Sequence, residues 1–272
     1  MEKSILQKSL RLIPDWATKQ ARLTRAFVMS ILYHGEERWC PVCEKSSRKF
    51  HPFGIVPRED ARCMICGALE RHRFVWQYFS RLTNLFDGTP KKMLHVAPEP
   101  CFKSILRNRL GQDYITADLS DPRVMVKMDI TNIQYPDEYF DFIYCSHVLE
   151  HVQDDKRAMR EFCRVLKQGG GAILLVPITA DRTIEDFSIV DPSERLRVFG
   201  QGDHVRRYGT DYIDRLRESG FTVKVSSVSD LFEKHDIERM GLTPASGEIY
   251  YCSKFNQDGR GFAVDDLKTV SY

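Results

Sequence analysis

From Lys91 onward, short apolar runs alternate with amphipathic helical segments, and this alternation constrains the fold more than any other feature. We expect strands at residues 92–97, 114–118, 124–129, 139–145, 172–177, 221–228 and 248–255. Helices are predicted at 102–110, 154–167 and 210–219, the first two ended by glycines. This order predicts an α/β, doubly wound fold, in which a mostly parallel sheet is covered by helices on both faces.

The composition indicates a soluble globular protein with one large domain and an appendage. The 272 residues include 40 basic and 38 acidic side chains, a balance that gives nucleic-acid binding no support but leaves it open. No apolar run approaches the ~20 residues that span a membrane, and the first residues lack the apolar core of a signal peptide. We therefore expect a cytoplasmic location.

The chain is expected to divide into three parts. Residues 1–34 are predicted to form a helical segment in two pieces, separated by Pro14. Leu6, Leu10 and Ile13 share one face of the first piece. In the second, Leu23, Phe27 and Ile31 share a face that we expect to be packed, with a membrane-surface helix as the alternative. Residues 35–82 hold a zinc-knuckle module, and residues 83–272 the α/β domain.

Two cysteine pairs, "CPVC" and "CMIC", predict a closed zinc site. Each turn presents two thiolates, and the four ligands Cys40, Cys43, Cys63 and Cys66 would complete a tetrahedron, which makes the Zn²⁺ structural. The module has two open interpretations: recognition through the basic, aromatic run "LERHRFVWQYF" at 69–79, or a cap stapled onto the main domain. We expect the other cysteines to be inert core residues; these are Cys101, Cys145, Cys163 and Cys252.

Acidic residues follow two of the predicted strands. In an open parallel sheet a ligand binds at the carboxyl ends of the strands, where the strand order reverses. Asp118 ends the second strand, where a carboxylate can accept hydrogen bonds from both hydroxyls of a ribose. Asp129 ends the third strand and can accept one from an adenine amino group. These positions suit a nucleoside cofactor.

Residues 129–155, "DITNIQYPDEYFDFIYCSHVLEHVQDD", and 161–178, "EFCRVLKQGGGAILLVPI", carry a family resemblance. Over residues 91–255 the chain resembles the class I S-adenosylmethionine-dependent methyltransferases. The resemblance implies a Rossmann-like sheet of seven strands, the last antiparallel, and S-adenosylmethionine as cofactor. It further implies cofactor contacts from Asp118 and Leu119 at the ribose, Asp129 and Ile130 at the adenine, and Cys145, Ser146 and His147 at the methionine end.

The first loop departs from the family pattern. Where an acidic residue and a glycine-rich turn are usual, "MLHVAPEPC" places His95, Ala97 and Glu99 between prolines. S-adenosylmethionine has no pyrophosphate to be cradled by backbone amides, and its methionine end carries an ammonium and a sulfonium. We therefore interpret Glu99 as a replacement for the glycine turn, a departure that counts against NAD or FAD more than against S-adenosylmethionine.

Residues 147–151, "HVLEH", match the H-x-x-E-H pattern of certain zinc proteases. Two histidines four residues apart can share a metal on a helix. Here the motif directly follows a buried strand, at a position that the methyltransferase resemblance explains. We therefore interpret Glu150 and His151 as loop and helix-cap residues and His147 as a neighbour of the cofactor.

The polar stretch 178–209 shows no clear structure and is expected to be a lid over the carboxyl edge of the sheet. Its segment "FGQGDHVRRYG" gathers a histidine beside an aspartate, which suits a general base near neutral pH. We expect His204 to be that base, assisted by Asp203, with His147 as the next candidate. Acceptor-binding side chains are expected at Arg206, Arg207 and Tyr208.

Three functions agree with these features. The favoured one is O-methylation of a small molecule or sugar. The second is methylation of RNA, since some ribosomal-RNA methyltransferases join a zinc module to this fold. It would need a basic stripe, whereas residues 35–82 carry nine basic and six acidic side chains, a net +3. The third is a zinc-containing binding protein without catalysis.

Overall fold

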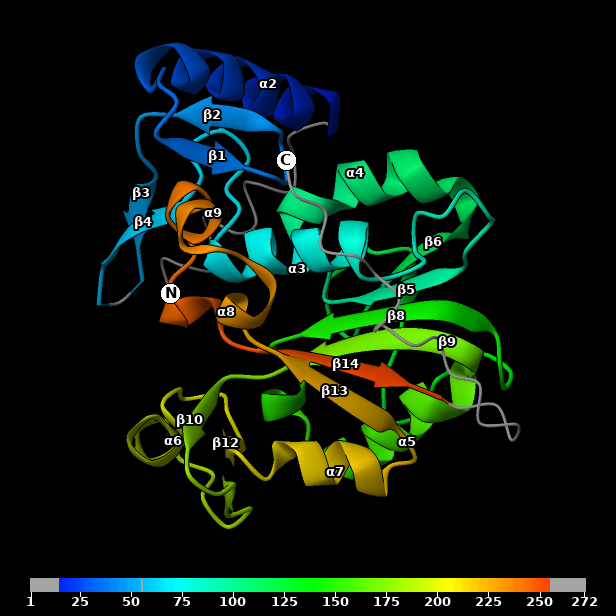
Figure 1. The fold of residues 1–272 in the computed structure, drawn as a ribbon. Coiled ribbons are helices and arrows are strands. Elements are labelled where there is room, and N and C mark those ends of the chain that lie inside the picture. The colour runs from blue at the N-terminus through cyan, green and yellow to red at the C-terminus, as the bar shows by residue number, and fades with distance from the viewer. Residues whose placement is uncertain (1–14, 55, 255–272) are drawn as a thin grey trace.

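The computed structural model describes residues 15–54 and 56–254. Its centre is a seven-stranded sheet with the order β13-β14-β9-β8-β5-β6-β7 (Figure 1). The strands are β5 (Met93–Val96), β6 (Tyr114–Asp118), β7 (Val126–Lys127), β8 (Phe140–Ser146), β9 (Leu166–Leu175), β13 (Thr222–Ser226) and β14 (Ile249–Ser253). Strands β5 to β9 pair in parallel, whereas β14 runs antiparallel to both β9 and β13. The predicted fold class is confirmed.

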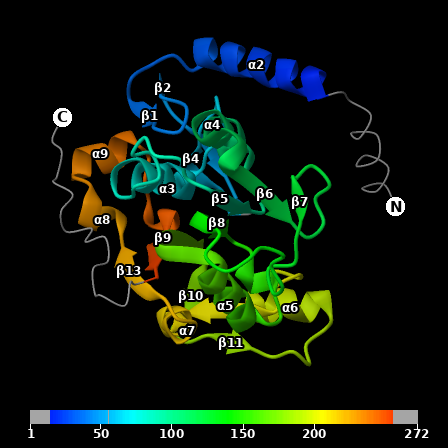
Figure 2. The same ribbon diagram turned by 90° about the vertical axis from the view of Figure 1, so that its right-hand side faces the viewer.

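Helices cover both faces of the sheet. Helices α3 (Glu70–Arg81) and α4 (Pro100–Leu110) lie on one face, and α5 (Asp155–Val165) and α7 (Tyr212–Glu218) on the other (Figures 1 and 2). Successive residues of β14 illustrate the arrangement, because side chains alternate along a strand. The ring of Tyr250 lies 5.0 Å from that of Tyr212 in α7, and the ring of Tyr251 lies 5.8 Å from that of Tyr78 in α3. The apolar runs of the sequence are therefore buried on two sides.

The cysteine-rich segment folds into two hairpins that pack on the main domain. These hairpins are β1 (Arg38–Cys40) with β2 (Lys45–Ser47), and β3 (His51–Phe53) with β4 (Arg58–Arg62). The buried Arg73 guanidinium of α3 donates hydrogen bonds to the backbone oxygens of Ala61 and Ala68, at 2.9 and 3.0 Å. It also donates to the oxygen of Gly241, 2.9 Å away, after the short helices α8 (Val228–Leu231) and α9 (Lys234–Arg239). One side chain thus joins α3 to the cysteine-rich segment before it and to Gly241, which is distant in the chain.

The expectation of a packed N-terminal stripe is wrong for the described part. Helix α2 (Asp15–Leu32) is continuous and lies across the outside of the cysteine-rich hairpins (Figure 1). Leu23, Phe27 and Ile31 are 57, 66 and 60% exposed, so this face has no partner among the described residues. The predicted face of Leu6, Leu10 and Ile13 falls outside the described residues, as does Pro14.

The stretch 178–209 is structured, contrary to the expectation from its polarity. It contains β10 (Ile178–Ala180), β11 (Ile184–Glu185), α6 (Pro192–Phe199) and β12 (Arg206–Gly209). The three strands form a small sheet in the order β10-β12-β11. Asp191 begins α6 by accepting hydrogen bonds from the backbone N–H groups of Ser193 and Glu194, and Gly200 ends it with a left-handed φ of 90°. We call residues 178–209 the lid.

Within residues 15–54 and 56–254, no helix combines the length and the apolar composition needed to cross a membrane.

His72 lies in the first turn of α3, and its side chain is buried. Its Nδ1 accepts a hydrogen bond from the backbone N–H of Leu69 at 3.1 Å, and this bond requires an unprotonated nitrogen. Burial, and next the charge of Arg71, lower the pKa of His72 to about 3. The folded protein therefore keeps this imidazole neutral at pH values where an unfolded chain would protonate it.

We expect His72→Gln to make the protein less sensitive to acid. Between the unfolded pKa of about 6.5 and the folded pKa of about 3, the unfolded state binds one more proton than the folded state. The wild-type free energy of unfolding should therefore fall by up to about 1.4 kcal/mol per pH unit through this group as the pH drops through that window. Urea unfolding at several pH values measures it, with His235→Gln, at an exposed position on α9, as the control. Parallel losses in wild type and His72→Gln would contradict the assignment.

Candidate active site

Two residues at neighbouring strand ends have left-handed backbone conformations. Ala97, after β5, has a φ of 47°, and His147, after β8, has a φ of 55°. Strands β5 and β8 pair in parallel, so these residues lie side by side at the carboxyl edge of the sheet. Side chains with a Cβ rarely adopt this conformation, and it concentrates at functional sites. Ala97 thus takes the conformation that a glycine would supply.

The carboxylate of Glu99 is held by buried side chains. One oxygen lies 2.6 Å from Nε2 of His95, and the other accepts a hydrogen bond from the hydroxyl of Tyr144 at 3.0 Å. Nδ1 of His95 lies 2.7 Å from the hydroxyl of Tyr114. Burial raises the pKa of Glu99, but its hydrogen bond with His95 and the charge of that histidine outweigh this effect and lower the pKa to about 2. The loop therefore carries a carboxylate that is ionised and 13% exposed.

The predicted nucleoside residues lie at the ends of β6 and β7. Oδ1 of Asp118 accepts hydrogen bonds from the backbone N–H groups of Ser120 and Asp121, both at 2.7 Å, which orients the carboxylate. Leu119 is 60% exposed beside it. In the next loop Asp129 is exposed, whereas Ile130 is buried.

The end of β8 is buried up to the point where the backbone turns. Cys145 and Ser146 are buried, and burial raises the pKa of the Cys145 thiol well above its ordinary value. Burial also raises the pKa of the Cys101, Cys163 and Cys252 thiols, which agrees with inert cysteines. The half-exposed His147 follows, with Nδ1 3.3 Å from the carboxylate of Glu150.

The lid is joined to the loop after β8 by the buried Arg206. Its guanidinium donates hydrogen bonds to the backbone oxygens of Leu149 at 2.8 Å and Gln153 at 2.6 Å, and also to that of Val152. The hydroxyl of Tyr208 donates to Asp155 at 2.6 Å, and burial raises the Tyr208 pKa well above its ordinary value. The sequence suggested contacts with an acceptor, whereas these two side chains bind the protein itself.

Arg207 is also used within the lid. Its Nε donates a hydrogen bond to the Thr179 hydroxyl at 2.9 Å, and its Nη2 donates to the Thr179 backbone oxygen. This half-buried side chain therefore joins β12 to β10.

The predicted base, His204, meets two residues that the sequence analysis left outside the site. Ligand atoms of Glu150, His151 and His204 lie within 4.8 Å of one another. The His151 and His204 rings are 4.7 Å apart, and Asp203 contacts His151 at 3.4 Å. Burial, and next the charge of His151, lower the pKa of His204, which keeps this imidazole neutral near pH 7. The "HVLEH" motif could have indicated Glu150 and His151 as site residues. No sequence pattern predicts that they lie close to His204.

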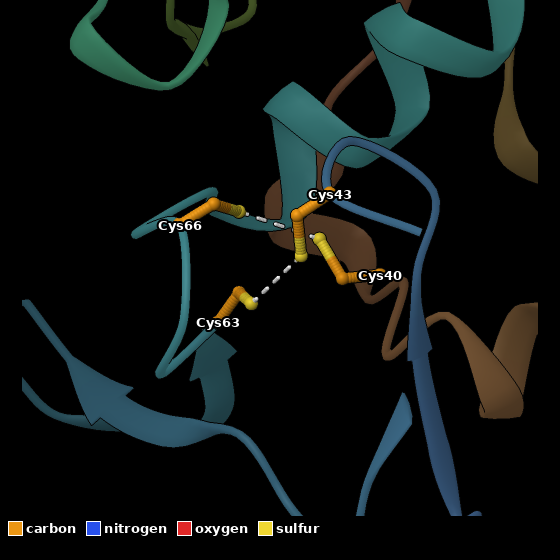
Figure 3. Close-up of side chains that lie close together, drawn as sticks. All are labelled: Cys40, Cys43, Cys63 and Cys66. Atoms are coloured by element: carbon orange, nitrogen blue, oxygen red, sulfur yellow. Dashed lines mark hydrogen bonds between the residues drawn. The ribbon is translucent and has the colours of Figure 1, made fainter. Parts of the chain in front are cut away.

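The four paired cysteines converge in one cluster (Figure 3). Cys40 and Cys66 have sulfurs 3.6 Å apart, those of Cys43 and Cys63 are 3.8 Å apart, and all four lie within 4.8 Å of one another. A tetrahedral zinc with Zn–S bonds of about 2.3 Å requires sulfurs roughly 3.8 Å apart, whereas a disulfide requires about 2.05 Å. The donor set and its spacing could hold a metal ion.

The two cysteine turns share one backbone geometry. The residue after each pair is left-handed: Glu44 with a φ of 56° and Gly67 with a φ of 79°. Its N–H donates a hydrogen bond to the oxygen of the first cysteine of the pair, at 2.8 Å from Glu44 to Cys40 and 3.0 Å from Gly67 to Cys63. Glycine at 67 indicated this turn in the sequence, but Glu44 did not.

The basic, aromatic run beside the cluster is buried. In α3 the buried residues extend from Glu70 to Phe79, except for the half-buried Arg71. Phe79 packs its ring edge-on against Phe142 and Tyr144 of β8, at 5.6 and 5.2 Å. This burial supports a cap packed on the main domain rather than recognition through this run.

Residues 90–174 match the family described as "Methyltransferase domain". The chain is also 32% identical over 108 residues to the 27-O-demethylrifamycin SV methyltransferase of Amycolatopsis mediterranei (strain S699), which covers 38% of this chain and 37% of that protein. It is 32% identical over 68 residues to the ajmaline N-methyltransferase of Rauvolfia serpentina. This match covers 25% of this chain and 23% of that protein. The chain thus matches less than half the length of these curated relatives.

Two solved structures are similar to this chain in part. One is an S-adenosylmethionine-dependent methyltransferase from Mesorhizobium loti, with a TM-score of 0.43, 13% identity, and 65% of this chain and 96% of that chain covered. The other is the [4+2]-cyclase SpnF, with a TM-score of 0.48 and 17% identity. The match covers 87% of this chain and 95% of that chain. Residues 90–174 are thus similar to a methyltransferase domain, and the seven-stranded sheet with an antiparallel last strand agrees with the fold that the sequence resemblance implied.

Proposed function

We propose that this protein transfers a methyl group from S-adenosylmethionine to a hydroxyl of a small molecule or sugar. The observation that carries the proposal is the position of the lid. Its buried Arg206 joins it to the loop after β8, so His204 lies at the carboxyl edge of a methyltransferase sheet. The names of two relatives also point to small acceptors, 27-O-demethylrifamycin SV and ajmaline.

The residues at the strand ends suit this cofactor, which supplies an electrophilic methyl group when it is bound. We assign Asp118 and Leu119 to the ribose, Asp129 and Ile130 to the adenine, and the segment 145–147 to the methionine end. The hydrogen bonds of Asp118 support this, because its own turn engages only Oδ1.

The first loop retains a glycine-like backbone without a glycine. Ala97 has the left-handed φ that permits a tight turn between β5 and α4, and Nε2 of the buried His95 contacts the carboxylate of Glu99. We propose that Glu99, ionised and partly exposed, adds negative charge near the cationic methionine end. Its hydrogen bonds to His95 and Tyr144 would keep that carboxylate in place.

The acceptor must lose a proton as its oxygen forms the bond to the methyl carbon. We propose that Nε2 of the neutral His204 takes this proton, because this nitrogen is buried and has no hydrogen-bond partner among the described residues. His147 is the next candidate, held by Glu150. Asp203 contacts His151 directly and acts on His204 through its charge.

Three lid side chains that the sequence suggested as acceptor ligands contact the protein itself: Arg206, Arg207 and Tyr208. The buried Arg206 donates to the loop after β8, the buried Tyr208 donates to Asp155 of α5, and Arg207 donates to Thr179. We propose that they orient the acceptor indirectly, because they hold the lid that carries His204. Buried, fully paired groups of this kind give a site one fixed geometry.

We further propose that the four clustered cysteines bind structural Zn²⁺. The spacing of their sulfurs supports a closed tetrahedral site without an open position. The ion would fix the start of α3, where His72 contacts both Cys101 and Glu99. A metal in the module would therefore support the first cofactor loop from behind. The burial of α3 does not favour the RNA-methyltransferase alternative, because the basic, aromatic run at 69–79 is used in packing.

Cys63→Ser should remove one chelator-resistant zinc per chain and lower stability. A structural site contributes a large part of the folding free energy of its module, and each kcal/mol lost lowers the melting temperature of a chain of this size by about 2–4 °C, so we expect a fall of roughly 10 °C. Elemental analysis and thermal unfolding measure both, with Cys163→Ser as the control. A wild-type protein without chelator-resistant metal would exclude the structural site.

Asp118→Ala should weaken S-adenosylmethionine binding by about tenfold to a hundredfold, since hydrogen bonds to a charged group contribute about 1.5–3 kcal/mol. Calorimetric titration with S-adenosylmethionine and S-adenosylhomocysteine measures the loss. Asp113→Ala, at the amino end of β6, is the matched control and should bind normally.

The same titration decides the role of Glu99. If Glu99→Gln binds as tightly as the wild type, its carboxylate serves only His95 and Tyr144. Failure of the wild type to bind either ligand would reject the proposed function and favour a binding protein without catalysis.

His204→Ala should leave cofactor affinity nearly unchanged and lower kcat by about 10²–10⁴-fold, the usual contribution of a general base. The wild-type rate should fall as the pH drops through the pKa of His204, and this acid limb should lie below pH 6.5 because burial lowers that pKa. Turnover and its pH profile are measured on an acceptor found by screening small hydroxyl compounds, with the exposed His235→Ala as the control. Full turnover in His204→Ala would transfer the role to His147.

A further inference from the structure

Three side chains with metal-binding atoms converge between the lid and the loop after β8. Glu150 and His151 belong to the short helix η3 (Leu149–His151), and His204 precedes β12. One ligand atom from each lies within 4.8 Å of the others. The cluster is separate from the four cysteines and combines residues more than 50 positions apart in the chain.

Two of the three side chains are buried with an unsatisfied polar atom. Glu150 is 1% exposed and His204 is 4% exposed, yet Oε2 of Glu150 and Nε2 of His204 have no hydrogen-bond partner among the described residues. An unpaired carboxylate oxygen and an unpaired imidazole nitrogen are both unfavourable in the interior. Two such atoms in one cluster indicate that a third group belongs between them.

We propose that Glu150, His151 and His204 bind a divalent transition-metal cation of the Zn²⁺ type. Imidazole nitrogens suit Zn²⁺, Fe²⁺ and Co²⁺ better than Mg²⁺ or Ca²⁺, which prefer oxygen ligands throughout. Two histidines and one carboxylate are the ligand set of several metalloenzyme sites that leave coordination positions open. His151 is the exposed member, so the open position faces solvent.

The neighbouring residues hold these ligands in a suitable orientation. Oε1 of Glu150 is taken by His147 at 3.3 Å, which leaves Oε2 for the cation. Nδ1 of His151 lies 3.4 Å from the carboxylate and 3.3 Å from the backbone oxygen of Asp203, which leaves its Nε2. The second nitrogen of a metal-binding histidine usually meets a carboxylate or a carbonyl in this way.

The two halves of the site are also joined by backbone. The N–H of Val205 donates a hydrogen bond to the oxygen of Glu150 at 2.9 Å, and the guanidinium of Arg206 donates to Leu149 and Gln153 on either side. The ligands therefore lie on segments that are fixed relative to each other before any cation binds. A preorganised set of this kind lowers the conformational cost of binding.

This inference goes beyond the proposed methyl transfer and does not depend on it. A cation at this site would use Nε2 of His204, so His204 would hold the metal rather than accept a proton itself. A hydroxyl-bearing molecule at the open position would have its hydroxyl pKa lowered by the cation. Glu150, His151 and His204 would then assist the loss of the acceptor proton through the cation, instead of His204 accepting that proton directly.

The test measures metal binding without cofactor or acceptor. The full-length protein, with Zn²⁺ retained in the cysteine cluster after chelator treatment, is titrated with Co²⁺ by calorimetry and visible absorption. We expect one equivalent of Co²⁺ with the weak absorption of nitrogen and oxygen ligands, and without the strong near-ultraviolet band of a cobalt thiolate. Glu150→Gln and His204→Ala should each weaken binding by at least about tenfold to a hundredfold, whereas His235→Ala should bind as the wild type does.

A second measurement avoids the variants, in case a substitution in the buried cluster prevents folding. X-ray absorption at the cobalt edge of the wild-type complex counts the imidazole ligands, and we expect two. The inference is overturned if the wild type binds no Co²⁺ beyond the cysteine cluster, if cobalt has no imidazole ligand, or if folded Glu150→Gln and His204→Ala both bind with unchanged affinity. Cation binding by a protein that transfers no methyl group would reject the proposed function alone.

Discussion

The position of the lid and of His204 depends on one buried arginine side chain, that of Arg206. Arg206 donates hydrogen bonds to three backbone oxygens between Leu149 and Gln153, after β8, and Glu185 at 3.1 Å and Asp155 at 3.6 Å balance its charge. Removing one partner of such a buried pair costs about 3–5 kcal/mol, because the other charge stays buried. Since Val205 and His204 precede Arg206 directly, the same contact fixes the backbone that carries His204 over Glu150 and His151.

A second set of contacts connects the cysteine-rich hairpins with the loop after β5. Arg73 joins these hairpins to α3 and to Gly241, and His72, at the start of the same helix, contacts Glu99. The cysteine-rich hairpins and the loop after β5 are therefore contacted by neighbouring residues of one buried helix. We interpret the module as a support for that loop, because its basic and aromatic side chains are used in packing.

Much of the fold could be predicted from periodicity, and the failures have physical reasons. The strand "EIYYCS" is apolar on both faces, and this pattern requires helices on two sides, as α3 and α7 provide. The lid was expected to be structureless because its strands are two to four residues long, too short for a period of two to appear. The stripe of Leu23, Phe27 and Ile31 predicted burial, but periodicity alone does not say whether a partner is present.

The sequence by itself determined the sheet, the cysteine pairs and the acidic residue at the end of β6, because these depend on local spacing along the chain. Only the tertiary structure decided the surroundings of His204, since Glu150 and His151 come from a loop more than 50 residues earlier. It also decided that Ala97 adopts the conformation of a glycine and that Arg206 faces inward. Burial and backbone torsion follow from packing between distant segments, and no local pattern contains that information.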